Sequence, residues 1–363
     1  MRPYNGRMKG FDKILFITVC LLSIAGIFAI YSATHSYGTL SNVITQSASF
    51  LLGLILMIIM TFFDYEQYEG MIKYIAGVTI FLLLLVLIVG QSGDWGAQSW
   101  IRIGPIGIQP AEIAKVAFII TFSYHLELVH EKINKPKVLL GLIAHAAVPI
   151  GLILLQPDAG SAMVFIFIFL VMIFIAGLSF KYIIPAGIAG IASLPVIYSF
   201  LSEFQKDRIR VFFDPESDPL FRGYNVIQSK IAVGSGQFFG TGYLKGTQTQ
   251  FDFLPTKHTD FIFSVICEEF GFLGAIIIIS ALAFLIFRCI KTAKEANSLF
   301  GKYICVGVSA MLIFHVTENC GMCIGLTPVT GIPLPFISYG GTSLITYMIA
   351  IGLVMSVAYR SRK

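Results

Sequence analysis

The chain has 363 residues, of which 56% are hydrophobic and 12% are charged, with a net charge of +5. Soluble globular domains carry roughly one quarter charged residues, so this composition excludes a soluble fold that hides its apolar surface in a core. Apolar runs recur along nearly the whole length. They predict an all-α polytopic integral membrane protein, with one membrane domain over residues 1–363 and no soluble domain.

Ten apolar runs come near the roughly 20 residues that an α-helix needs to cross a bilayer. They predict spans at 12–33, 44–63, 72–90, 111–129, 138–156, 161–178, 182–201, 262–290, 301–326 and 340–358. The first run follows basic residues, as the apolar region of a signal peptide does. Because nine further spans follow it, we interpret it as an uncleaved anchor.

Lysine and arginine are distributed unevenly between the predicted spans. Most of the 25 basic residues fall at the amino terminus, in alternate loops such as those with Lys137 and Lys294, and in the carboxyl-terminal tail. Cytoplasmic loops accumulate these residues, so we expect both termini in the cytoplasm. The positive net charge therefore reflects membrane topology and does not indicate nucleic-acid binding.

The segment 202–261 is predicted to be one long extracytoplasmic loop, and long connections of this kind are often lids or binding segments. An apolar stripe over 224–233 predicts a helix that lies on the membrane interface. The glycines of 234–242 would let backbone amides approach a phosphate. Flexible turns are the simpler interpretation, because no strand precedes them.

The six cysteines all lie in or at the ends of apolar runs, so we interpret them as packing residues and not as a disulfide framework. Cys320 and Cys323 share one helix face, as two ligands of a metal would. Neither a second pair nor a histidine cluster completes such a site in the sequence. The sequence predicts no metal site made by the protein alone.

Charged residues within or at the outer edge of the spans indicate function, because an unpaired charge in hydrocarbon costs at least several kcal/mol. Glu112 and Lys115 are three residues apart and can form a pair on one helix face. Glu268 and Glu269 point about 100° apart on a helix. We expect one of them to face a cavity while the other finds a partner.

Asp260 lies where the long loop re-enters the membrane, directly after Lys257, His258 and Thr259. One interpretation is an N-cap for the eighth span. The other is a general base, held near cations that would attract an anionic substrate. The two roles are compatible, because a helix N-terminus favours the ionised carboxylate that a base requires.

Five stretches of the chain resemble the SEDS proteins of shape, elongation, division and sporulation. They are GAQSWIRIGPIGIQPAEIAK (96–115), QPDAGSA (156–162), RIRVFFDPESDPLFRGYNVIQSKIAVGSGQFFGTG (208–242), FLPTKHTDFIFSVICEEFGFLG (253–274) and PVTGIPLPFISYGGTS (328–343). They follow the family's order over essentially the whole chain, and PVTGIPLPF is more similar to the RodA elongation branch than to the FtsW division branch. Ala111 and Ala159 depart from the serine and leucine usual there, but neither change removes a charge.

The resemblance implies a ten-helix peptidoglycan glycosyltransferase of the bacterial cytoplasmic membrane, which polymerises lipid II for elongation and rod shape beside a class B penicillin-binding protein. It implies that Asp260 is the catalytic carboxylate. An inverting single displacement needs only one base, so Asp260 would deprotonate the acceptor hydroxyl. The expected substrate-binding residues are Trp100, Arg102, Glu112, Lys115, Arg208, Arg210, Lys257, His258 and Glu269.

Within that set, Arg102, Lys115, Arg208 and Arg210 are the candidates to stabilise the diphosphate leaving group. A divalent cation, Mg²⁺ or Mn²⁺, would share that task, although the sequence contains no dedicated cage for it. Trp100 would stack on a sugar or, in the simpler interpretation, anchor the chain at the interface.

Two other classes of protein remain open. The first is a transporter that flips the lipid-linked precursor along a polar path of intramembrane charges, although the sequence has no inverted repeat. The second is an inactive scaffold that holds a penicillin-binding protein. The family resemblance implies that the single helix of the penicillin-binding protein contacts the lipid-facing surface of the eighth and ninth spans, near Ala275–Ile279.

Overall fold

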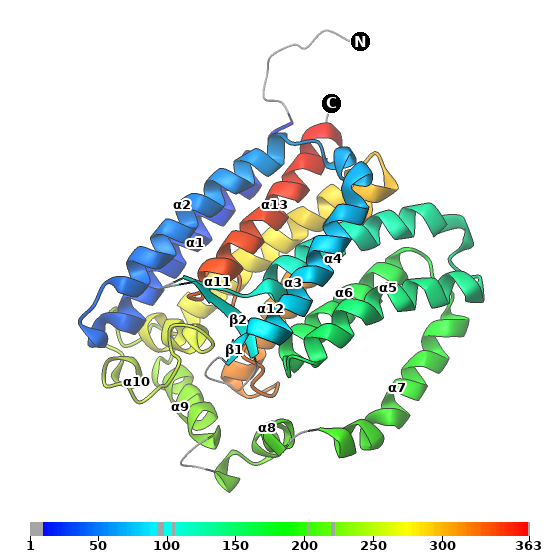
Figure 1. The fold of residues 1–363 in the computed structure, drawn as a ribbon. Coiled ribbons are helices and arrows are strands. Elements are labelled where there is room, and N and C mark those ends of the chain that lie inside the picture. Colours follow the sequence, from blue (N-terminus) through cyan, green and yellow to red (C-terminus); the bar gives the residue numbers. More distant parts are fainter. Residues whose placement is uncertain (1–9, 93–97, 104–105, 202, 219–221, 362–363) are drawn as a thin grey trace.

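The computed structural model describes residues 10–92, 98–103, 106–201, 203–218 and 222–361. Among these residues, ten long apolar helices lie at the ten predicted spans (Figure 1). They are α1 Lys13–Thr34, α2 Ser41–Phe62, α3 Ile72–Val89, α4 Pro110–Val129, α5 Pro136–Leu154, α6 Ala159–Ile175, α7 Phe180–Phe200, α11 Ile262–Glu295, α12 Leu299–Ile324 and α13 Gly341–Ser361. Eight of them are long and apolar enough to cross a membrane, while α6 and the part Phe180–Ser193 of α7 are shorter apolar helical stretches. The polytopic helical architecture is confirmed.

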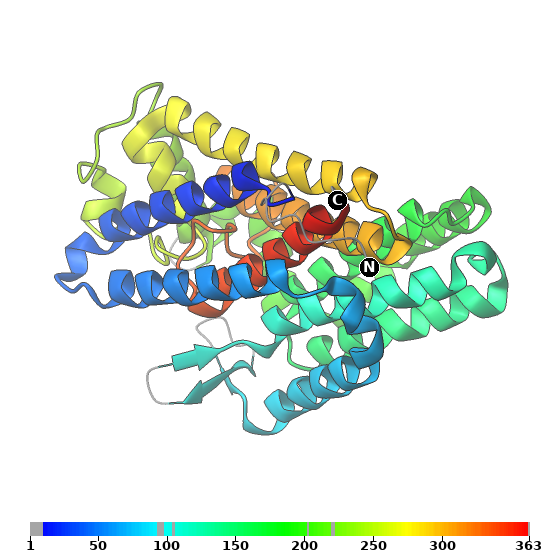
Figure 2. The same ribbon diagram turned by 90° about the horizontal axis from the view of Figure 1, so that it is seen from above.

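The bundle is centred on α12 and α13. Seen from above, α13 runs through the middle, with α11 on one side and α2 on the other (Figure 2). α12 packs against α11, α4 and α6, and α13 packs along α2. In their apolar windows 67% of α12 and 78% of α13 are buried, compared with 11% for the helix that ends at Val89. Polar side chains on α12 and α13 are therefore shielded from lipid.

The long loop is largely helical and lies at the end of the molecule opposite both termini (Figure 1). It contains α8 Glu203–Phe213, the short 3₁₀ helix η4 Pro215–Ser217, α9 Arg222–Ser235 and the single turn α10 Thr247–Gln250. The helix predicted at 224–233 is confirmed, and its place on the membrane interface stays a prediction, since Ile231 is 44% exposed. Val226, Ser229 and Ala232 are buried where α9 packs on α11 and α12.

A small antiparallel sheet between α3 and α4 was not expected from the all-α prediction. Its strands are β1 Gln91–Ser92, β2 Gln98–Ile103 and β3 Ile106–Ile108, in the order β1-β2-β3. Arg102 pairs with Gly107 in the register of β2 and β3. Thr342, at the start of α13, donates a hydrogen bond to Gly107 O at 3.0 Å. The sheet thus holds β2 against the end of the bundle where the long loop lies.

α11 is broken near its start at Gly271, whose φ of 65° and ψ of −162° are not helical. The backbone of the long loop takes up the hydrogen bonds that the break releases. Thr241 N donates to Glu268 O at 2.9 Å, and Phe272 N donates to Gln237 O at 2.8 Å. A break inside a membrane helix is tolerated where other protein groups satisfy the backbone. The loop is therefore part of the bundle and not a separate flap.

This docking explains the glycines of 234–242. A Cβ at Gly240 would collide with the carbonyl oxygen of Glu269, and one at Gly236 would collide with that of Cys267. Glycine is needed here because two backbones approach closely. The amides of 240–242 already donate to protein carbonyls, so interpreting them as a phosphate cradle is wrong. Residues 236–239 do form turns, and the flexibility expected of them stays a prediction.

Candidate functional site

Asp260 lies at the end of the long loop, two residues before α11 begins. Phe261 occupies the N-cap position and makes no side-chain capping hydrogen bond, so the N-cap interpretation of Asp260 is wrong. Asp260 is 6% exposed. Gly331 of the α12–α13 loop, with φ +75°, lies beside its carboxylate, and a Cβ built there would be 3.7 Å from Oδ2. The carboxylate is therefore confined between two loops.

The backbone around Asp260 is fixed from the other side of the bundle. Three consecutive carbonyls, each an obligatory acceptor when buried, receive a hydrogen bond from α12 or from the α12–α13 loop. These bonds are Tyr339 N to His258 O at 2.9 Å, Ser338 Oγ to Thr259 O at 2.7 Å, and Asn319 Nδ2 to Asp260 O at 2.8 Å. The catalytic candidate is thus carried by a rigid segment, as a preorganised base requires.

Asn319 joins the two loops. Its side chain is fully buried, and its amide nitrogen donates both to Asp260 O and to Ile332 O, each at 2.8 Å. An asparagine amide has two N–H donors, and both are used. Asn319, Ser338 and Tyr339 were not predicted from the sequence as residues of the site. An amide inside an apolar span was the one signal available for Asn319.

Two further carboxylates border the same loop. Glu318 accepts a hydrogen bond from Thr330 Oγ1 at 2.9 Å. Asp158 caps α6 by accepting from Ser161 N at 2.9 Å and also accepts from Gln109 Nε2 at 3.2 Å. Both carboxylates therefore accept hydrogen bonds from hydroxyl or amide groups of the protein. In the described part of the chain no three His, Cys, Asp or Glu side chains form a metal-binding group, so the residues do not fit a protein cage for Mg²⁺ or Mn²⁺.

Lys257 fastens the long loop to the end of α1. It is 1% exposed, donates to Thr249 O and to Ser36 Oγ, and forms an ion pair with Asp252. Its ammonium also lies 5.1 Å from the centroid of the Tyr37 ring. The predicted role of Lys257 in substrate binding gains no support from this position. The side chain is used to close the loop.

Glu268 and Glu269 both bind the long loop. Glu268 accepts from Gln248 N at 2.7 Å and from Thr249 N at 3.0 Å, which anchors the start of α10. Glu269 accepts from Ser32 Oγ and from Leu244 N at 3.2 Å. The expectation that one of the two would face a cavity while the other found a partner is wrong, because both find partners. These contacts give Glu269 a structural role, and its substrate contact stays a prediction.

The predicted pair of Glu112 and Lys115 is confirmed, with 2.7 Å between Lys115 Nζ and Glu112 Oε1. The side chains are 3% and 1% exposed, so neither reaches a substrate directly in this packing. Lys115 Nζ lies 3.0 Å from His315 Nε2. His315 was not identified from the sequence, and its ring connects α4 to the centre of the bundle.

The remaining candidates lie around the same end of the molecule. His258 is half-buried between the rings of Tyr37 and Tyr339. Trp100 packs against Gly107 in the sheet, while Arg102 is exposed.

Arg208 and Arg210 lie on α8, which packs against η4 and α9. Arg208 is half-buried, and the side chain of Arg210 is 58% exposed and pairs with Asp207 at 2.8 Å. Their approach to a substrate, like that of Arg102, stays a prediction.

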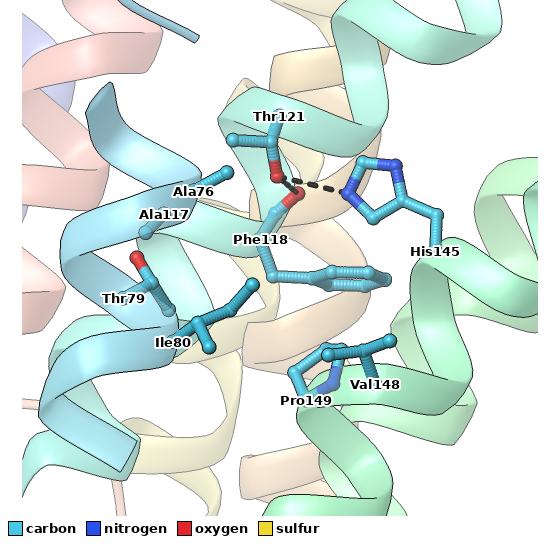
Figure 3. Close-up of a pocket in the computed structure, with 9 residues that line it drawn as sticks. All are labelled: Ala76, Thr79, Ile80, Ala117, Phe118, Thr121, His145, Val148 and Pro149. Carbon is cyan, nitrogen blue, oxygen red and sulfur yellow. Dashed lines mark hydrogen bonds between the residues drawn. The ribbon is translucent and has the colours of Figure 1, made fainter. Parts of the chain in front are cut away.

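A cavity of about 250 Å³ lies elsewhere, between α3, α4 and α5 (Figure 3). It is lined by Ala76, Thr79, Ile80, Ala117, Phe118, Thr121, His145, Val148 and Pro149. Its polar side chains bond within the protein: Thr79 Oγ1 donates to Ile75 O at 2.7 Å, and Thr121 Oγ1 lies 3.2 Å from His145 Nε2. The cavity shares no residue with the surroundings of Asp260, and it lacks the carboxylates and cations of the candidate site.

The chain is similar to known proteins over nearly its whole length. The model of the family FTSW_RODA_SPOVE, described as cell cycle protein, matches residues 12–363. Peptidoglycan glycosyltransferase MrdB of Escherichia coli (strain K12) is 36% identical over 350 residues, which cover 95% of this chain and 93% of that protein. Peptidoglycan glycosyltransferase RodA of Treponema pallidum (strain Nichols) is 33% identical over 436 residues, which cover 98% and 99%.

The fold is also similar to solved structures. One of them is a chain from a peptidoglycan synthase complex, a structure concerned with the coordination of polymerization and crosslinking. It superposes with a TM-score of 0.85 and 30% sequence identity. The superposition covers 97% of this chain and 98% of that one. The helices and the long loop therefore share one arrangement with that protein.

Proposed function

The chain belongs to the FtsW, RodA and SpoVE family of cell cycle proteins, and we propose that it is a peptidoglycan glycosyltransferase that polymerises lipid II into glycan strands. The full-length similarity to relatives with this activity supports the reaction class. The single observation that carries the proposal is Asp260, a confined carboxylate at the loop end of the bundle whose backbone carbonyl is held by Asn319.

The proposed reaction is an inverting single displacement. The acceptor 4-hydroxyl attacks the anomeric carbon of an α-linked lipid diphosphate, the β-glycosidic bond forms, and the diphosphate leaves. Asp260 takes the proton of the attacking hydroxyl. A positioned general base contributes typically 10²–10⁴-fold to such a step. The fixed backbone of 258–260 supports this role, because a base must meet the hydroxyl in one geometry.

The leaving diphosphate needs positive charge. Arg102 and Arg210 are the first candidates, since both side chains are exposed. Arg208, half-buried on α8, is the third candidate. Lys115 and Lys257 are buried and paired, so they act by holding protein segments. This division assigns anion binding to the arginines, whose planar forks suit phosphate oxygens.

The membrane orientation follows from the same proposal. Both termini lie at one end of the bundle and α8, α9 and α10 at the other (Figure 1). The excess of lysine and arginine on the terminal side supports a cytoplasmic location for both termini, with Asp260 at the outer face of the bacterial cytoplasmic membrane.

The proposed partner is a class B penicillin-binding protein, whose single membrane helix packs on α11 and α12. Ile276, Ile277 and Ile279 of α11 are 44%, 57% and 38% exposed, which leaves an apolar surface available for a helix. The similarity to a chain from a peptidoglycan synthase complex supports such an assembly. The similarity of PVTGIPLPF to the RodA branch of the family supports a role in elongation and rod shape.

Purified protein incubated with lipid II in detergent tests the proposed activity. We expect glycan strands that lengthen with time, and we expect their synthesis to continue in the presence of a transpeptidase inhibitor. A flippase and an inactive scaffold both predict no glycan without another glycosyltransferase. An absence of glycan from folded, partner-bound protein would contradict the proposed function.

A further inference from the structure

His315 is the centre of a buried polar cluster that the proposed reaction does not use. Its Nε2 lies 3.0 Å from Lys115 Nζ, and its Nδ1 lies 2.7 Å from Tyr347 Oη and 3.2 Å from Pro333 O. His315, Lys115 and Tyr347 are each 1% exposed. One imidazole thus connects α4, α13 and the α12–α13 loop.

The hydrogen-bond chemistry fixes the form of this ring. A lysine ammonium donates three hydrogens and accepts none, so Nε2 of His315 accepts from Lys115 and carries no proton. The single ring proton is then on Nδ1, and Tyr347 Oη and Pro333 O share it as acceptors. A second positive charge beside Lys115 would be disfavoured in this buried place. His315 is therefore a neutral connector.

The cluster reaches the segment of Asp260 through two adjacent carbonyls. His315 and Asn319 are four residues apart and lie on the same face of α12. Asn319 binds Ile332 O, and His315 binds Pro333 O, the next carbonyl along the loop. Asn319 also binds Asp260 O. The loop beside the carboxylate is therefore held at two successive points by one helix face.

We propose that His315 is a positioning residue for polymerisation, which ties the Glu112–Lys115 pair of α4 to the loop that lies against Asp260. It touches neither substrate nor reacting atoms in this role. The inference rests on the proposed function, because the activity it tunes is the transfer catalysed with Asp260. It explains why Lys115, which is only 1% exposed, lies beside His315.

The first test compares His315→Phe with His315→Gln. Phenylalanine fills the space but binds neither Lys115 nor Pro333 O, and a small misplacement of a reacting group costs up to about 100-fold in rate. We expect His315→Phe to lower kcat about 10- to 100-fold with little change in KM. Glutamine offers an oxygen to Lys115 and an N–H to Pro333 O, so it restores most of kcat. Equal losses in the two variants would overturn the proposal.

A double-mutant cycle separates positioning from packing. If His315 and Lys115 act as one unit, His315→Phe combined with Lys115→Met loses little more activity than the worse single variant. Additive losses would overturn the proposal. His145→Phe is the matched control, because His145 is also bonded within the membrane bundle but lies at the separate cavity. If His315→Phe does not fold, Tyr347→Phe takes its place. It keeps the aromatic ring of Tyr347 but removes the hydroxyl beside His315 Nδ1, so kcat should fall below the wild-type value, by less than the loss expected for His315→Phe.

Hydrogen exchange gives a readout that does not need activity. Leu334 N bonds to Ser338 Oγ and Tyr339 N to His258 O, so their exchange reports how firmly the loop is held. We expect faster exchange over 326–340 in His315→Phe and wild-type exchange in His315→Gln. Unchanged exchange in both would overturn the positioning role even in an active enzyme. If His315→Phe exchanges faster but the wild-type protein makes no glycan, the proposed function is contradicted while the role of His315 in holding the loop stands.

Discussion

Asn319 donates a hydrogen bond from its side-chain amide to the backbone carbonyl of Asp260 at 2.8 Å. The two residues are 59 positions apart in the sequence, with Asn319 in α12 and Asp260 in the turn that precedes α11. The bond makes the position of the carboxylate depend on α12 as well as on the loop that carries it. Because the same amide binds Ile332 O, α12 sets the spacing between the two loops at the site.

Asn319→Leu should therefore impair both stability and activity. It leaves the buried carbonyls of Asp260 and Ile332 without this donor, and an unsatisfied buried group costs about 1–3 kcal/mol. We expect a lower melting temperature and a fall in kcat that exceeds any change in KM. Thermal unfolding and lipid II polymerisation measure the two effects. Asn297→Leu, at an exposed asparagine of the opposite end, is the control, and equal behaviour of the two variants would refute the role of Asn319.

The turn at 251–257 should detach from Ser36, just after α1, only in acid. Burial raises the pKa of Asp252, but hydrogen bonds from Lys257 and Ser36 and the lysine charge outweigh it, so its pKa lies below the ordinary value. An acid with a lowered folded pKa stabilises above its unfolded pKa, about 3.9 for Asp, and loses that contribution as pH falls through the folded value. Proteolysis of this turn should be flat from pH 8 to pH 5 and rise below about pH 4. Asp252→Asn should remove the pH dependence, and an unchanged rise in that variant would reject this explanation.

Cysteine labelling tests the orientation. Lys137→Cys and Ser217→Cys place thiols at exposed positions of opposite ends of the bundle. An impermeant reagent added to intact cells should modify the thiol at 217 and leave the one at 137 unmodified until the membrane is opened. Labelling of both from the outside would be incompatible with the proposed topology.

The apolar surface of α11 should bind the partner helix. Ile277→Trp adds bulk at a side chain that is 57% exposed, so we expect weaker co-purification with a class B penicillin-binding protein and less stimulated activity. Ile188→Trp on α7, at a side chain that is 64% exposed, is the control. Intact co-purification with Ile277→Trp would exclude this part of α11 from the interface.

The ten spans could be predicted because bilayer thickness fixes the length of an apolar run. Asp260 could be selected as the candidate base from its charge and its motif. Its position in a turn before α11, and not at the helix N-cap, could not be predicted. Residues 255–261 form turns, so α11 starts at Ile262 and Asp260 is not its cap. The roles of Asn319 and His315 depend on contacts with Asp260, Lys115 and the α12–α13 loop. Periodicity does not reveal such contacts between distant segments.

The small sheet and the break in α11 were missed for local reasons. Two of the strands have only two and three residues, too few for an alternation pattern to appear. Gly271 lies in a long apolar run, where a single glycine is tolerated by a continuous helix. Only the docked loop backbone shows that the helix is interrupted there, and the same docking accounts for the glycines that resemble a phosphate loop.

The most direct measurement is lipid II polymerisation by purified Asp260→Asn protein, with folding and partner binding checked on the same sample. Asparagine keeps the size of the side chain and leaves the backbone bond to Asn319 available, so the fold should be retained. Loss of a general base should reduce the rate roughly 100-fold or more. Glycan synthesis at a near-wild-type rate would contradict Asp260 as the base.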